Sequence, residues 1–215
     1  MTKKGSSSRS SRGYSNRSVD RLQPIPKFLI VCEGEKTEKY YFEKFPVPTR
    51  PKVIVKGIGY VTLSLVKETI ELVKNEDIKI GDGYEDQVWC VFDRDFKKEN
   101  FNAQNYNSAI ALAQKSEFHV AFSNDAFELW YILHFEYYES ETHREDYAKL
   151  LEKRLGHKYE KNSETMYEEL LDKQPKAIQH AKKLLERYDP DMTGNHNPST
   201  TVYLLVKELN KFMRR

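Results

Sequence analysis

The alternation of apolar and polar stretches predicts buried strands separated by amphipathic helices. Apolar residues run without a polar break over 28–32 and again over 88–92. Short runs rich in β-branched and aromatic residues are typical of parallel strands covered on both faces. Two further short strands are predicted over 52–56 and 118–122. Parallel strands require helical connections that cover the sheet, so the expected fold class is α/β.

Helical patterns fill the segments between these strands and dominate the chain beyond residue 135. The expected helices span 37–45, 62–74, 102–115, 144–155 and 176–188, with a last helix near the C-terminus. Thr37 is expected to cap the first helix, and Asn197 and Pro198 to open the last as N-cap and first helical residue. That last helix carries one apolar face and should pack on the core.

Three regions follow from this pattern. Residues 1–26 are rich in Ser, Arg and Gly and are expected to form a disordered basic tail. Residues 27–135 are expected to form the α/β core. Residues 136–215 are expected to form a helical extension that packs on the core and completes the site.

Charge separates the tail from the rest of the chain. Residues 1–27 contain seven Lys or Arg and one Asp, a net charge of +6, so the remainder carries −4 of the total of +2. The tail is either an electrostatic arm for nucleic acid or a solubilising leader without a role of its own.

The composition also indicates a cytoplasmic protein. No apolar run approaches the roughly 18 residues of a membrane span, and no apolar segment follows the N-terminal lysines as in a secretory signal. Cys32 and Cys90 fall inside predicted strands, where they are expected to be reduced core thiols.

Acidic residues follow two predicted strands at the point where each ends. Glu33 comes directly after the first strand, and Asp93 and Asp95 come after the strand over 88–92. Ligands of open α/β sheets bind at this edge. If the strands are neighbours, the carboxylates converge and repel one another unless they are protonated or share a cation. Hard oxygen ligands of this kind suit Mg²⁺ or Mn²⁺.

Two further acids each have a structural and a functional interpretation. Glu38 lies in the first turn of a helix, where it either stabilises the helix dipole or binds a metal. Glu128 lies in a strongly apolar stretch and should be paired, hydrogen-bonded or bound to metal. Asp125 and Glu128 also have the spacing of a capping box, which is compatible with a site role.

Four sequence blocks carry a resemblance to a known family. They are CEGEKTEKYY at 32–41, FDRD at 92–95, SNDAFELW at 123–130 and NPST at 197–200. A strand ending in Glu-Gly and a later one ending in Asp-x-Asp resemble the Toprim domain of topoisomerases, primases and OLD-type nucleases. All four blocks in order are more similar to the RloB-like family, which includes the AbiLii abortive-infection proteins. The resemblance covers about residues 27–210.

The resemblance implies a Toprim-like Rossmannoid sheet and a set of site residues. Glu33, Asp93 and Asp95 would be catalytic and, with Glu38 and Glu128, would hold Mg²⁺ or Mn²⁺. A lysine completes the site in related nucleases; Lys158 is the first candidate and Lys161 the second, although either could be a solvated surface residue. Basic residues around the carboxyl edge of the predicted sheet are the expected contacts to nucleic acid: Lys36, Arg94, Lys97 and Lys98. For Arg94, which lies between the two aspartates, pairing with a nearby acid is the preferred interpretation over a phosphate contact.

Two functions from different classes remain open. In the first, the protein is a metal-dependent nuclease that hydrolyses DNA or RNA as the effector of an abortive-infection system, with an RloA-like AAA-type ATPase as partner. In the second, it is a non-catalytic regulatory or nucleic-acid-binding module of the same system.

Overall fold

The computed structural model describes residues 25–47, 51–94, 103–188 and 196–213. Its centre is a five-stranded sheet with the order β2-β1-β3-β4-β5. The strands are β1 (Lys27–Cys32), β2 (Lys52–Gly57), β3 (Gln87–Asp93), β4 (His119–Asn124) and β5 (Ser199–Thr200). The first four are parallel and β5 is antiparallel to β4. The predicted α/β class is confirmed, and the arrangement is consistent with a Rossmann-like or Toprim-like fold.

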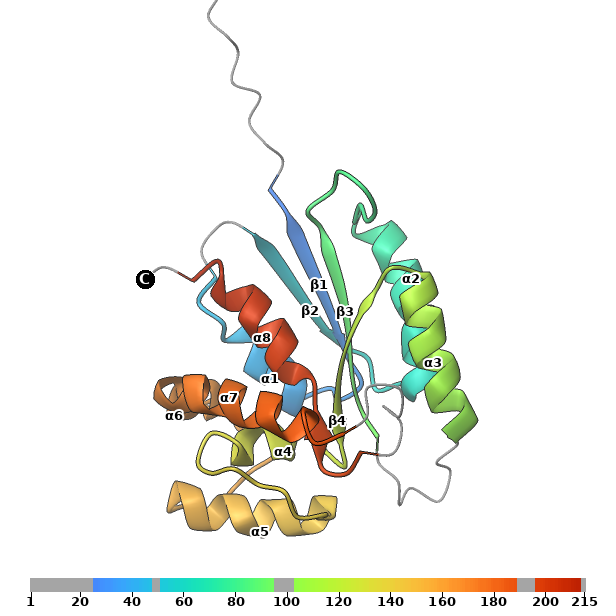
Figure 1. The fold of residues 1–215 in the computed structure, drawn as a ribbon. Helices are drawn as coiled ribbons and strands as arrows, with labels where there is room; N and C mark the ends of the chain where they lie inside the picture. The colour runs from blue at the N-terminus through green and yellow to red at the C-terminus, as the bar shows by residue number, and fades with distance from the viewer. Residues whose placement is uncertain (1–24, 48–50, 95–102, 189–195, 214–215) are drawn as a thin grey trace, which may run out of the picture.

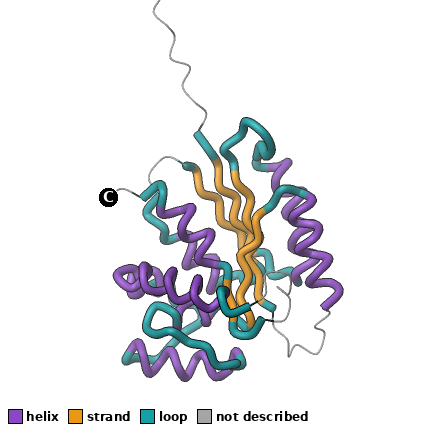
Figure 2. The backbone as a smooth tube through the Cα atoms, in the orientation of Figure 1, coloured by secondary structure: helices purple, strands orange, loops and turns teal. Residues whose placement is uncertain are grey.

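Helices cover both faces of this sheet (Figures 1 and 2). Two helices, α2 and α3, lie on one side, and the others lie on the opposite side or near its carboxyl end (Figure 1). The described helices are α1 (Thr37–Glu43), α2 (Thr62–Asn75), α3 (Ala103–Lys115), α4 (Glu128–Ile132), α5 (Arg144–Leu155), α6 (Met166–Leu170), α7 (Gln174–Leu185) and α8 (Val202–Asn210), and the 3-10 turn η1 (Leu171–Lys173) precedes α7.

The period of the strands divides the core into two clusters. Leu29 and Val31 of β1 face the cluster made with α2 and α3. Phe28, Ile30 and Cys32 of the same strand face the cluster made with the other helices. Successive strand residues point to opposite faces, so an unbroken apolar run is what a strand covered on both faces requires.

The C-terminal segment enters the sheet before it becomes helical, which makes the expected cap at Asn197 wrong. Ser199 and Thr200 pair with the end of β4, and α8 begins only at Val202, after Thr201. The hydroxyl groups of Ser123 and Thr200 also lie 3.0 Å apart in this pairing. A two-residue strand has no recognisable period, whereas the apolar face expected for the last helix is buried as predicted.

Two other expected caps are also wrong, because their side chains contact the extension instead. Lys36 precedes α1, and the Thr37 hydroxyl donates to the Lys161 carbonyl oxygen at 3.0 Å. Phe127 precedes α4 without a side-chain cap, so Asp125 and Glu128 form no capping box there. Asp125 accepts a hydrogen bond from the backbone N–H of Arg144 at 3.3 Å.

Both cysteine thiols lie in the core, as the sequence predicts. Cys32 and Cys90 are free and buried, and burial raises the pKa of both, that of Cys90 to about 12. Among the described helices, none combines the length and the apolar character needed to cross a membrane. The tail expected over 1–26 lies almost wholly outside the described residues.

Candidate functional site

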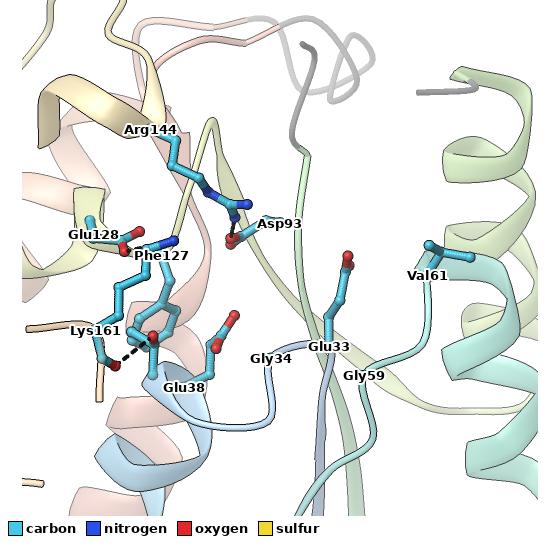
Figure 3. Close-up of a pocket in the computed structure, with 11 residues that line it drawn as sticks. Glu33, Gly34, Glu38, Gly59, Val61, Asp93, Phe127, Glu128, Arg144 and Lys161 are labelled. Atoms are coloured by element: carbon cyan, nitrogen blue, oxygen red, sulfur yellow. Dashed lines mark hydrogen bonds and ion pairs between the residues drawn. The ribbon is translucent and has the colours of Figure 1, made fainter. Parts of the chain in front are cut away.

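A pocket of about 250 Å³ lies at the carboxyl ends of the central strands. Its acidic and basic side chains come from the ends of β1 and β3, from α1, α4 and α5, and from the segment after α5 (Figure 3). The lining residues are Glu33, Gly34, Thr37, Glu38, Gly59, Val61, Asp93, Phe127, Glu128, Arg144 and Lys161.

Glu33 is held between the neighbouring strand ends. Its backbone N–H donates to the Val91 carbonyl oxygen at 2.8 Å, and its own carbonyl oxygen accepts from Gly59 N–H at 3.1 Å. Gly34 then lets the chain turn close to α1, because a Cβ at this position would lie 2.0 Å from the Glu38 carboxylate. The Glu-Gly pair therefore brings two acids to one side of the turn.

Asp93 is the last residue of β3 and is only 8% exposed. Its Oδ2 accepts a hydrogen bond from Arg144 Nη2 at 2.5 Å. Its Oδ1 is buried and has no hydrogen-bond partner in the described part of the chain. The pKa of Asp93 is raised well above its ordinary value, first by burial and then by the charge of Glu38, while Arg144 acts in the opposite direction.

Glu38 lies in the first turn of α1 and is 5% exposed. Its pKa is raised to about 7, chiefly by burial; a hydrogen bond to its own backbone opposes this, and the charges of Glu128 and Glu33 add to it. An acid with such a pKa is partly protonated near neutral pH, and a bound cation would favour its ionised form.

Glu128 begins α4 and is paired with two side chains of the extension. The Tyr159 hydroxyl donates to its Oε1 at 3.2 Å, and Lys161 Nζ lies 3.8 Å from the same oxygen. The apolar neighbours of Glu128 in the sequence fill the core, so this buried carboxylate has the pairing that its surroundings require.

The expected basic residues are distributed differently. Lys161 lines the pocket, whereas Lys158 and Lys36 are exposed and do not line it. Arg94 is buried and its guanidinium lies over the Tyr106 ring, 5.2 Å from the ring centre. Asp95, Lys97 and Lys98 lie outside the described residues.

Arg144 is the pocket residue that sequence reasoning missed. It opens α5, 51 positions after Asp93. The sequence around it shows only a charged helix, and nothing local marks it as a partner of Asp93. Tyr159 was missed for the same reason, because its link to Glu128 spans 31 positions.

The carboxylates that line the pocket are of the ligand type that a hard cation prefers, but their positions do not form a ready metal site in the described ranges. Carboxylate oxygens suit Mg²⁺. The buried Oδ1 of Asp93 is one such oxygen, and it accepts no hydrogen bond from the described residues. However, no group of three His, Cys, Asp or Glu side chains in the described ranges is arranged to hold a metal ion. Instead, Arg144 and Lys161 provide the positive charge beside Asp93 and Glu128.

Comparison with known proteins gave one match. The model of the family described as RloB-like protein matches residues 28–209, which include every residue that lines the pocket. No curated protein and no solved structure matched the chain.

Proposed function

We propose that this chain, which belongs to the RloB-like family, is a metal-dependent nuclease. Membership of that family fits a defence-associated protein. The finer proposal is that the protein hydrolyses DNA or RNA as the effector of an abortive-infection system, together with an RloA-like AAA-type ATPase. The nuclease activity is inferred from the resemblance of the sequence to Toprim and AbiLii proteins.

The observation that carries the proposal is the gathering of four carboxylates around one pocket. Glu33, Glu38, Asp93 and Glu128 all line it, and the last three are at most 8% exposed. Burying mutually repelling acids costs free energy of folding, so their retention at the ligand-binding edge of a parallel sheet favours a function.

The chemistry proposed is hydrolysis of a phosphodiester. Mg²⁺ or Mn²⁺, held by Asp93, Glu38 and Glu128 with Asp95 as an expected further ligand, would supply Lewis acidity and a more acidic bound water. Glu33 would act as general acid and base or as a ligand. In the reaction, water oxygen bonds to phosphorus and one ester P–O bond breaks. The water gives up a proton, the leaving oxygen gains one, and the products are a phosphate monoester and an alcohol.

Two observations favour the non-catalytic alternative. Arg144 and Lys161 already offset part of the negative charge of the pocket, and no ready group of three metal ligands exists in the described ranges. A regulatory or nucleic-acid-binding module could retain such ion pairs without performing any reaction.

A cleavage assay tests the proposal. Purified protein is incubated with DNA or tRNA and Mg²⁺ or Mn²⁺, with and without the ATPase. We expect metal-dependent cleavage that Asp93→Asn lowers by roughly 100-fold or more. Asp146→Asn, an exposed acid on α5 that pairs with Lys149, is the matched control and should retain activity. Equal rates for wild type and Asp93→Asn, or no cleavage under any condition, would contradict the nuclease proposal.

Thermal denaturation gives a second readout that does not depend on activity. A cation at about 100 times its Kd stabilises the state that binds it by about 2.7 kcal/mol. We therefore expect Mg²⁺ to raise the Tm of the wild type and of Asp146→Asn, but not of Asp93→Asn. Equal shifts in all three proteins would place the metal elsewhere.

A further inference from the structure

We propose that Arg144 is a substrate-binding residue of this site: its guanidinium exchanges Asp93 for a non-bridging oxygen of the phosphodiester when a divalent cation binds to the acids. The inference rests on the proposed nuclease function and assigns to that site the group that recognises phosphate. It concerns a residue of the extension, whereas Glu33, Glu38 and Asp93 come from the first half of the chain.

The backbone of Arg144 is anchored independently of its side chain. Its N–H donates to Asp125 Oδ2 at 3.3 Å, just after the end of β4. Helices α4 and α5 are also in contact, and the buried Tyr147 and Leu151 of α5 belong to the larger core cluster. The guanidinium could therefore change partner without moving α5.

The ion pair with Asp93 has one buried and one accessible partner. The Asp93 side chain is 7% exposed, whereas the Arg144 side chain is 30% exposed. Figure 3 shows Arg144 extending from α5 toward the Asp93 carboxylate at the edge of the pocket. A ligand arriving from solvent would thus meet the guanidinium beside the acids, rather than a residue hidden beneath them.

A cation on the acids would weaken this ion pair. In its ionised form, Asp93 attracts the guanidinium strongly, because its side chain is buried. A divalent ion on the same carboxylate would neutralise that charge and compete for its oxygens. The released guanidinium would remain positive and close to the pocket, where a phosphodiester is the anion that the proposed function supplies.

Guanidinium chemistry suits this exchange. Its planar set of N–H donors matches two oxygens of a carboxylate or of a phosphate in the same geometry. Arg144 would transfer no proton and form no covalent bond. It would offset the charge that develops on the phosphate oxygens as water attacks.

The other basic residues in the described part of the chain are placed less favourably. Lys161 lines the pocket but is 53% exposed at the side chain, and its Nζ lies 3.8 Å from Glu128. Arg94 is buried against Tyr106, and Lys158 does not line the pocket. Arg144, in contrast, makes a close hydrogen bond to Asp93, the acid at the end of the central strand β3.

The test compares Arg144→Gln, Arg144→Lys and Arg154→Gln with the wild type. Arg154 is the matched control, because it is an arginine of the same helix whose pair with Glu136 is exposed. Three quantities are measured: Mg²⁺ affinity by calorimetry, affinity for a labelled DNA or RNA oligonucleotide in Ca²⁺, and kcat with KM in Mg²⁺. Circular dichroism and Tm check that each variant is folded.

We expect Arg144→Gln to change the affinity for Mg²⁺ and the affinity for the oligonucleotide in opposite directions. Arg144→Gln should bind Mg²⁺ about 3- to 10-fold more tightly, because a competing positive charge is lost. It should bind the oligonucleotide more weakly and lose roughly 100-fold in kcat/KM. Arg144→Lys should recover part of the oligonucleotide affinity, since it keeps the charge but not the planar donors. Arg154→Gln should match the wild type in all three.

Other outcomes overturn the inference in distinguishable ways. If Arg144→Gln and wild type bind the oligonucleotide equally, Arg144 is a permanent counterion of Asp93. If Arg144→Gln binds Mg²⁺ more tightly and cleaves faster than the wild type, the ion pair between Arg144 and Asp93 only inhibits the site, and Arg144 does not bind the substrate. A wild type that binds the oligonucleotide through Arg144 but does not cleave it refutes the nuclease proposal and leaves the inference standing.

Discussion

The two faces of the sheet are covered by layers of different character. The layer of α2 and α3 packs aliphatic and aromatic residues on the sheet, and Thr69 is the buried polar residue of α2. The opposite layer contains α1 and the helices after β4, and it supplies Glu38, Glu128, Arg144 and Lys161 to the pocket. The layer of α2 and α3, which belongs to successive strand–helix units, thus mainly supports the sheet. The opposite layer combines segments that are distant in the sequence, and it brings the charged residues of the pocket together.

Tyr41 shows how that second layer couples packing to the site. It is fully buried on α1, three residues after Glu38, so the packing of one helix places both. Its ring contacts those of Phe42, Phe45, Phe127, Trp130, Tyr131 and Tyr167. These neighbours come from α1 and the segment after it, from α4 and the residue before it, and from α6, so the orientation of Glu38 depends on packing against both halves of the chain.

The largest expected effect comes from removing this ring. We expect Tyr41→Ala to lower the free energy of unfolding by about 4 kcal/mol, and Leu65→Ala on α2 by about 3 kcal/mol, because both leave cavities in a buried cluster. Urea unfolding measures both losses. Only Tyr41→Ala should also abolish the Tm increase caused by Mg²⁺, since Leu65 lies in the other layer. If both variants lose that increase equally, the two layers do not differ in their coupling to the site.

A smaller effect concerns pH and the buried acid of α1. The folded pKa of Glu38 is about 7, against an ordinary value of 4.5. Its contribution to stability is therefore fully present below pH 4.5 and is lost as the pH rises through about 7, because the folded state disfavours the charged form. The loss is roughly 3 kcal/mol in the absence of metal.

Glu38→Gln isolates this contribution, because glutamine does not titrate. Between pH 4.5 and 8 without metal, the stability of the wild type should fall relative to that of Glu38→Gln in urea unfolding. Glu71→Gln, an exposed acid of α2 paired with Lys74, is the control from the other layer and should show no such trend. A pH-independent difference between wild type and Glu38→Gln would show that Glu38 keeps an ordinary pKa.

The smallest expected effect on stability comes from removing the hydroxyl group of Thr37 or of Thr69. Thr37 donates to the Lys161 carbonyl oxygen across the two halves of the chain, whereas Thr69 donates to Leu65 within α2. Replacing either by valine should cost about 1 kcal/mol or less. Only Thr37→Val should increase hydrogen exchange of the backbone over 157–164, because that bond joins this segment to α1. Unchanged exchange there would show that the hydrogen bond does not hold the segment.

Local sequence patterns were sufficient to predict the central strands and the helix over 144–155. The unbroken apolar runs over 28–32 and 88–92 required strands covered on both faces, and the structure contains them as neighbouring parallel strands. The helix expected over 144–155 has those exact bounds, and Gly156 ends it with a φ of 78°. Apolar periodicity and glycine conformation act over a few residues, so one sequence shows them without knowledge of the fold.

The caps and the partners of the acids depended on tertiary structure. Thr37 and Asp125 fit local capping rules, yet each bonds to a segment of the extension. Arg144 reaches Asp93, and Tyr159 reaches Glu128, across a distance in sequence over which no period operates. The sequence by itself placed Glu33 and Asp93 at the carboxyl ends of β1 and β3. Only the packing of the extension decided which cations meet the acids, because an ion pair between distant segments exists only after the chain has folded.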